Sequence, residues 1–148
     1  MKLFYRKYGE GPPLVILHGL YGFSDNWVTI AKSISRRFTV YLPDLRNHGS
    51  SPHSDIHDYR SLSSDIFELA NDLGLGKFFL AGHSMGGKAA MFYATEWPEM
   101  LDGMLIADIS PFRAIDFRSK EYSQSLVILN TMLETNVSSV LSRNDVER

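Results

Sequence analysis

A serine near the middle of the chain is flanked by glycines two residues away on either side. Ser84 follows an apolar run over residues 78–81, and a helix-compatible stretch comes directly after it. The residues from Gly82 to Gly86 match the G-x-S-x-G pattern of a nucleophile elbow, a sharp turn from strand to helix that exposes the serine hydroxyl. Glycines at both positions leave room for the strand and the helix to pass closely. We therefore predict that Ser84 is the nucleophile of a serine hydrolase.

A second motif overlaps the elbow. The residues from Gly82 to Lys88 fit G-x-x-x-x-G-K, the opening of a phosphate-binding P-loop. That motif needs serine or threonine at the next position to hold magnesium, and the next residue here is Ala89. We expect no nucleotide, no metal and no other cofactor.

The composition is typical of a globular domain. Hydrophobic residues make up 44% of the 148, charged residues 22%, and the net charge is -2. Phosphate contacts need clustered Lys and Arg, so a nucleic-acid partner is not expected. No run approaches the ~18 apolar residues of a membrane span, and the N-terminus turns polar too soon for a signal peptide. We expect a cytoplasmic protein with no membrane partner, and the lack of cysteine excludes a thiolate nucleophile.

Short apolar runs alternate with stretches of helical periodicity along the first three quarters of the chain. A weakly alternating segment over 3–8 predicts an edge strand, and the later strands are expected over 14–17, 38–42, 78–81 and 104–107. Between them lie predicted helices, the first with Ser24 as its N-cap. This alternation predicts an α/β fold, a mostly parallel sheet with helices on both faces. We assign 1–111 to this core and 112–148 to the start of a helical cap.

Ligands in such sheets bind at the carboxyl ends of the strands. Four polar segments fall at these ends: the loop that begins at His18, the loop over 44–52, the elbow serine, and Asp108. Asp108 is the candidate acid of a catalytic triad, with a helix cap or a solvated loop aspartate as the equal alternative. Asp44 is expected to brace its own loop through backbone hydrogen bonds.

An oxyanion hole needs two backbone donors near the serine. The N–H of Met85, at the start of the helix, and the N–H of Leu20 are the natural pair. Tyr21 and Phe23, in the same loop as Leu20, are expected to line an apolar pocket for a small or medium acyl group. His83 is a further candidate for substrate contact, because the sharp turn directs its side chain away from the serine hydroxyl.

The general base is missing from its expected place. An α/β-hydrolase triad runs in the order Ser, acid, His, but no histidine follows Ser84. His18 is better interpreted as an organiser of the oxyanion loop, and His48 remains an alternative base. The other histidines are His53, His57 and His83, and they too precede the serine.

Together these motifs resemble the esterase branch of the α/β-hydrolase superfamily that includes the YbfF-type esterases and the abhydrolase-domain-11 proteins. Four segments carry the resemblance. They are residues 18–22, the Asp-Leu-Arg-Asn-His-Gly run that starts at Asp44, residues 82–88, and Asp108-Ile109-Ser110-Pro111. It implies Ser84 as nucleophile, Leu20 and Met85 as oxyanion donors, and Asp108 as acid. Related yeast enzymes transfer acyl groups to alcohols.

The resemblance implies ester hydrolysis through a covalent acyl-serine. Acyl transfer to alcohols is the first alternative, and a catalytically inactive binding module is the second, because the base is absent. Family members continue through further cap helices and strands to a histidine-bearing loop, so we expect this chain to be the N-terminal part of a longer hydrolase. We also expect its last strand to pair with the missing segment as a second chain, or to self-associate.

Overall fold

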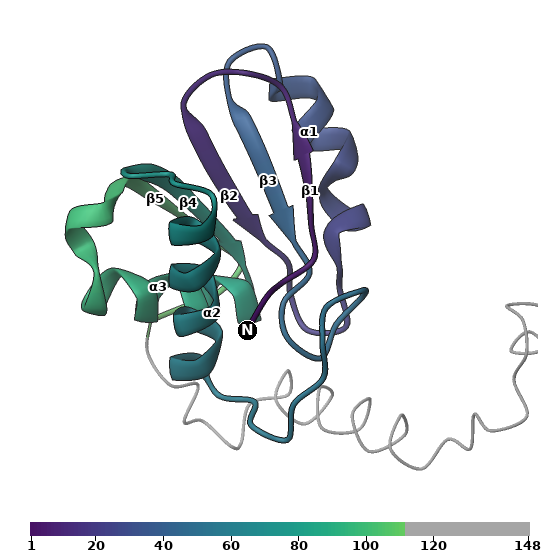
Figure 1. The fold of residues 1–148 in the computed structure, drawn as a ribbon, viewed down its shortest axis with the longest axis vertical. Coiled ribbons are helices and arrows are strands. Elements are labelled where there is room, and N and C mark those ends of the chain that lie inside the picture. The colour runs from purple at the N-terminus through teal and green to yellow at the C-terminus, as the bar shows by residue number, and fades with distance from the viewer. Residues whose placement is uncertain (112–148) are drawn as a thin grey trace, which may run out of the picture. The chain divides into compact units, whose positions relative to one another are not determined.

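The computed structural model describes residues 1–111 and places five strands in one sheet, in the order β1-β3-β2-β4-β5 (Figure 1). Strands β2, β3, β4 and β5 run parallel to one another, while β1 is antiparallel to β3. The strands are β1 (Tyr5–Tyr8), β2 (Pro13–Leu17), β3 (Thr39–Pro43), β4 (Phe78–His83) and β5 (Leu101–Ala107).

Helices connect the parallel strands. A short 3-10 turn, η1 (Ser24–Trp27), leads into α1 (Val28–Ile34), while α2 (Tyr59–Asp72), α3 (Met85–Glu96) and η2 (Pro98–Met100) follow. The prediction of Ser24 as a helix N-cap is wrong, since Ser24 is the first residue of η1 and Phe23 precedes it. The Ser24 backbone N–H instead donates to Asp44 Oδ1 at 2.7 Å.

Successive side chains of a strand point to opposite faces of the sheet, so one strand feeds two cores. Val15 and Leu17 of β2 pack in a cluster with residues of α2 and α3, among them Ile66 and Tyr93. Ile16, between them, packs instead with Ala31 of α1. The α/β architecture with helices on both faces is therefore confirmed.

The described residues leave β5 at the edge of the sheet, with β4 as its neighbour. Met104 and Leu105 on this strand are 45% and 62% exposed. None of the helices within residues 1–111 is long and apolar enough to cross a membrane. The predicted cap over 112–148 lies outside the described residues.

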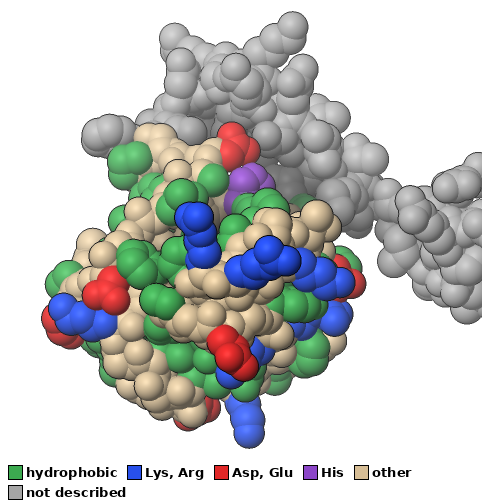
Figure 2. All heavy atoms as spheres, turned by 90° about the horizontal axis from the view of Figure 1, so that it is seen from above, with side chains coloured by type: hydrophobic (Ala, Val, Ile, Leu, Met, Phe, Trp, Pro, Cys, Tyr) green, Lys and Arg blue, Asp and Glu red, His purple; other side chains and the backbone are tan. Residues whose placement is uncertain are grey.

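The surface of the described part carries charges of both signs. Figure 2 shows Lys and Arg side chains among acidic and hydrophobic ones on one face. This mixture agrees with the small net charge of -2.

Candidate active site

Ser84 alone joins β4 to α3, because the strand ends at His83 and the helix begins at Met85. Its backbone has φ 50 and ψ -116, an unfavourable conformation for a residue with a side chain. Such a conformation costs about 1–3 kcal/mol and persists where the surrounding structure enforces it. A one-residue connection leaves no loop to surround a phosphate, so the P-loop alternative does not fit this turn.

The flanking glycines are required by backbone packing. A Cβ atom on Gly82 would lie 2.4 Å from the carbonyl oxygen of Gly86, and one on Gly86 would lie 2.5 Å from the carbonyl oxygen of His18. Both obstacles are main-chain atoms, which cannot rotate away as a side chain does. The glycine pair thus lets α3 start directly against β4 and against the end of β2.

The loop after β2 lies beside the elbow and is held through the Gly19 carbonyl. The Gly19 carbonyl oxygen accepts from the Gly22 N–H at 3.0 Å and lies 2.8 Å from Nδ1 of His18. The peptide that links Gly19 to Leu20 is trans, so the Leu20 N–H points to the side opposite that carbonyl. A Cβ on Gly19 would lie 3.4 Å from the Ser84 Cβ, which puts this peptide beside the elbow.

His18 is buried and its protonation state is fixed by two backbone groups. The Leu45 N–H donates to Nε2 at 2.9 Å, so the ring proton is on Nδ1, where the Gly19 carbonyl accepts it. Burial lowers the pKa of His18, which favours this neutral form. The ring contacts the loop that carries Gly19 and Leu20, and both of its nitrogens are engaged, so neither is free to act as a base.

Asp44 braces the same region from the end of β3, as predicted. Its side chain is buried and accepts from the Ser24 N–H at 2.7 Å and the Ser50 N–H at 2.8 Å. One carboxylate therefore ties the turn after the oxyanion loop to the loop over 44–52.

Asp108 follows β5 with φ 56, and its side chain is 84% exposed. Its Oδ2 lies 3.4 Å from Nε2 of His83, whose ring also packs edge-on against Trp27 at a centroid distance of 6.2 Å. Among residues 1–111, no hydrogen bond or ion pair joins Asp108 to Ser84. The structure thus places the candidate acid beside His83, at the same end of the sheet as the serine.

Ser84 opens into a pocket of about 380 Å³. Its walls come from the oxyanion loop, the elbow and α3, the start of α2, and the segment after β5; the other lining residues are Leu20, His57, Asp58, Tyr59, Leu62, Met85, Lys88 and Ile109. Tyr21 and His83 line a second hollow of about 470 Å³ that also includes Leu20. Phe23 lines neither of the two. Of the residues expected to contact substrate, none lines the pocket that contains Ser84.

Three of the histidines before the elbow have neighbouring rings. His48 lies between His18 and His57, at centroid distances of 5.0 and 5.8 Å, and its Nδ1 is 2.8 Å from the Arg46 carbonyl oxygen. Within the described residues, no histidine is hydrogen-bonded to the Ser84 hydroxyl. His57 alone of these rings lines the Ser84 pocket, and sequence analysis missed it, because it stands in a polar loop with no motif around it.

Comparison with known proteins agrees with this geometry. Residues 12–127 match the family described as alpha/beta hydrolase fold. The sn-1-specific diacylglycerol lipase ABHD11 of Danio rerio is 46% identical over 105 residues, 70% of this chain and 33% of that protein. Esterase YbfF of Escherichia coli is 28% identical over 124 residues, 84% of this chain and 48% of that protein. A solved structure titled "Marine microorganism esterase" superposes with a TM-score of 0.92 and 40% identity, over 99% of this chain and 56% of that one.

This chain belongs to the α/β-hydrolase fold family. Its relatives are esterases and lipases, and one yeast relative, 40% identical over 105 residues (68% of this chain and 31% of that protein), is named "Probable alcohol acetyltransferase". The resemblance predicted from the motifs is confirmed. The chain spans about a third to a half of the length of these curated relatives.

Proposed function

We propose that the complete protein is a serine carboxylesterase that acts on small-molecule esters, with Ser84 as its nucleophile. The observation that supports this most directly is the one-residue elbow at Ser84, with φ 50 and flanking glycines that no side chain can replace. A strained backbone kept at such a position is typical of functional sites. The esterases and lipases among the relatives support the same class of reaction.

In the proposed reaction the Ser84 hydroxyl oxygen attacks the ester carbonyl carbon and gives up its proton to a general base. The N–H groups of Leu20 and Met85 donate to the oxygen that becomes negative. The C–O bond to the alcohol then breaks, the base returns the proton to the leaving alcohol, and an acyl-Ser84 ester remains. Water repeats the sequence, which releases the acid and restores the serine. The general base comes from outside residues 1–111, and Asp108 is the carboxylate that orients it.

Acyl transfer is the second candidate, and the yeast relative named for that activity favours it. The acyl-Ser84 intermediate is the same, and an alcohol replaces water in the second half. Incubating the enzyme with an ester and a second alcohol, and then separating the products, tells the two apart. A new ester indicates transfer, and free acid alone indicates hydrolysis.

A fluorophosphonate probe tests the nucleophile, because it reacts with activated serines. We expect the complete protein to be labelled, Ser84→Ala to be unlabelled, and Ser33→Ala, an exposed serine of α1, to be labelled like the wild type. Labelling that survives in Ser84→Ala would contradict the assignment. An unlabelled wild-type protein would instead favour an inactive binding module.

A further inference from the structure

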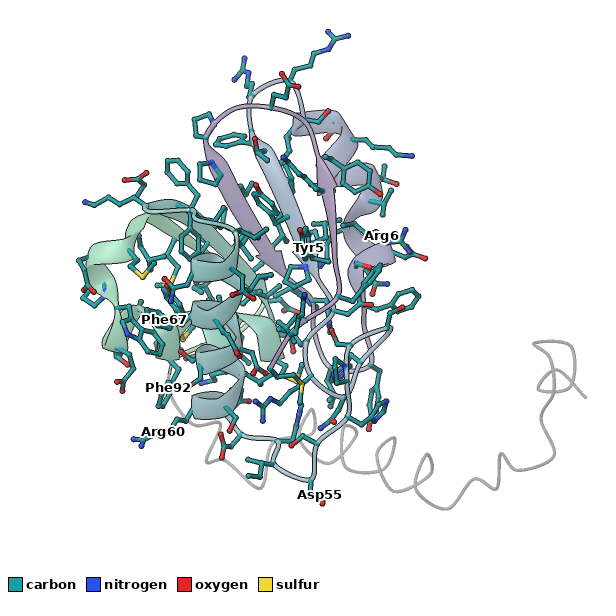
Figure 3. The ribbon with its side chains drawn as sticks, viewed as in Figure 1. Tyr5, Arg6, Asp55, Arg60, Phe67 and Phe92 are labelled. Atoms are coloured by element: carbon teal, nitrogen blue, oxygen red, sulfur yellow. The ribbon has the colours of Figure 1, made fainter. Side chains whose placement is uncertain are left out.

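His57 is held in the Ser84 pocket by both of its neighbours in the chain. The Ile56 carbonyl oxygen accepts from Nη1 of Arg46 at 2.8 Å, and the Asp58 side chain caps α2 by accepting from the Ser61 N–H at 2.7 Å. Figure 3 labels Asp55 and Arg60, which mark the segment that carries His57 from the β3–α2 loop into α2. The ring position is thereby set by two anchored flanks, although the loop itself is on the surface.

The tautomer of His57 follows from Asn47. The Asn47 Oδ1 accepts from the Ser54 N–H at 2.6 Å, which fixes the amide so that Nδ2 is the donor. That Nδ2 lies 3.3 Å from Nδ1 of His57. A donor facing Nδ1 requires a lone pair there, so the ring proton of neutral His57 is on Nε2.

The neutral form of the ring is favoured by its surroundings. His57 is an exposed residue, but the partial desolvation of its ring lowers its pKa, and the neighbouring His48 and Arg46 lower it further, against the opposing charge of Asp58. At neutral pH the ring therefore carries one N–H, on Nε2. Within residues 1–111 no protein group accepts that N–H, and the pocket around it is lined largely by apolar side chains such as Leu62 and Met85.

We propose that His57 is a specificity residue whose Nε2–H donates to a second oxygen of the substrate, apart from the scissile ester. The preferred substrate then carries a carbonyl or carboxylate oxygen on its acyl or alcohol part. This inference depends on the proposed function, because it takes the pocket at Ser84 as the substrate site. Lys88 and Asp58 both line the same pocket, so a substrate carboxylate would be attracted by the first and repelled by the second, whereas a ketone carries no charge for either to act on.

Matched esters test the proposal on the complete protein. Methyl hexanoate is compared with its 3-, 4- and 5-oxo analogues and with monomethyl glutarate, and hexyl acetate is compared with its oxo analogues. We expect one oxygen-bearing ester to exceed its plain counterpart in kcat/KM by roughly tenfold, the value of one well-formed hydrogen bond. If Lys88→Met loses the preference for monomethyl glutarate, the recognised group is a carboxylate. If Lys88→Met keeps an unchanged preference for an oxo ester, the recognised group is a ketone.

Three variants separate a donor from a merely structural side chain. His57→Phe keeps a ring without a donor, and we expect it to lose the preference. His57→Gln returns an N–H near the Nε2 position and should restore most of it. His53→Phe, an exposed histidine outside the pocket, should behave as the wild type.

A preference that is absent in the wild type, or that survives in His57→Phe, overturns the proposal. Loss in His57→Gln equal to that in His57→Phe also overturns it. Ser84→Ala keeps this result separate from the proposed function: if every ester is still hydrolysed by that variant, the esterase assignment itself fails. Nitrogen-15 spectra of the histidine rings provide a check without activity, since a His57 proton on Nδ1 would contradict the tautomer.

Discussion

The backbone N–H of Leu45 donates to Nε2 of His18 at 2.9 Å, and both residues are fully buried. Through this ring the end of β3 supports the Gly19 carbonyl, and with it the direction of the Leu20 N–H. The Leu20 N–H, the proposed oxyanion donor, thus depends on a backbone group that is 27 residues from His18 in the sequence.

His18→Phe tests this dependence. The change leaves the buried Leu45 N–H without its acceptor, so we expect the free energy of unfolding to fall by about 1–3 kcal/mol. The Gly19 peptide loses its tether as well, and we expect kcat to fall by roughly 100-fold with a small change in KM, as when one oxyanion donor is removed. Urea denaturation and ester hydrolysis measure the two effects. A loss of stability with kcat unchanged would show that His18 supports the fold alone.

Stability should depend on pH through the same residue. Burial lowers the pKa of His18 in the folded state, and the pKa of His57 is lowered too. The unfolded chain then binds more protons, so stability is complete well above the ordinary histidine pKa of about 6.5 and declines as pH falls through and below it. Urea midpoints from pH 8 to pH 5 measure the slope. His18→Phe should flatten it, whereas His53→Phe should leave it unchanged, and an equal slope in all three proteins would contradict the prediction.

Asp108 and His83 offer a separate test of the triad. If Asp108 orients a base elsewhere, Asp108→Asn should lower kcat by roughly 10⁴-fold, as for a triad aspartate, and His83→Gln should have a far smaller effect. Equal losses in the two variants would mean that their 3.4 Å contact is the functional unit. Hydrolysis of a short-chain nitrophenyl ester provides the rates.

The sequence was sufficient to predict the strands and the edge of the sheet where their carboxyl ends meet, because both follow from local patterns. Apolar runs such as 14–17 specify buried parallel strands, and parallel strands bring their carboxyl ends together. The position of Asp44 as a brace could also be predicted, since an aspartate at a strand end has backbone donors within reach.

Which side chains line the Ser84 pocket could not be predicted from local patterns. Tyr21 and Leu20 are adjacent and both line the second hollow, yet only Leu20 also lines the Ser84 pocket; Tyr21 has φ 60, and the chain turns there. His57 enters the Ser84 pocket through contacts of the segment around it with Arg46 and Asn47, which lie 10 residues earlier. Such arrangements depend on loop conformation, and a polar loop carries no periodicity from which to derive it.

Arg46 and Asp65 form a buried ion pair that holds this loop on α2. The guanidinium donates through Nε and Nη2 to the two carboxylate oxygens, at 2.6 and 2.8 Å. Asp65 Oδ1 also accepts from the Met1 amino group at 2.9 Å, so Arg46→Met leaves the carboxylate one cationic partner, whereas Asp65→Leu leaves the buried guanidinium without an ion-pair partner among residues 1–111. Asp65→Leu should therefore cost about 3–5 kcal/mol and Arg46→Met less. The double variant should be less destabilised than the sum of the two, because it no longer contains the unpaired guanidinium. Urea denaturation of the four proteins gives this comparison, and strictly additive losses would contradict it.

Strand β5 presents exposed apolar side chains at the edge of the described sheet. Leu105 is 62% exposed and lines an apolar hollow of about 500 Å³ together with Trp27 of η1 and Phe79 of β4. Within the described residues β5 pairs with β4 alone, and an apolar edge strand is a site of pairing between chains. A polypeptide of residues 1–148 should therefore self-associate in sedimentation velocity. Leu105→Lys should shift it toward the monomer, and Ile56→Lys, at a side chain 59% exposed but away from this hollow, should not. A monodisperse monomer of the unmodified polypeptide would show that the exposed edge is tolerated.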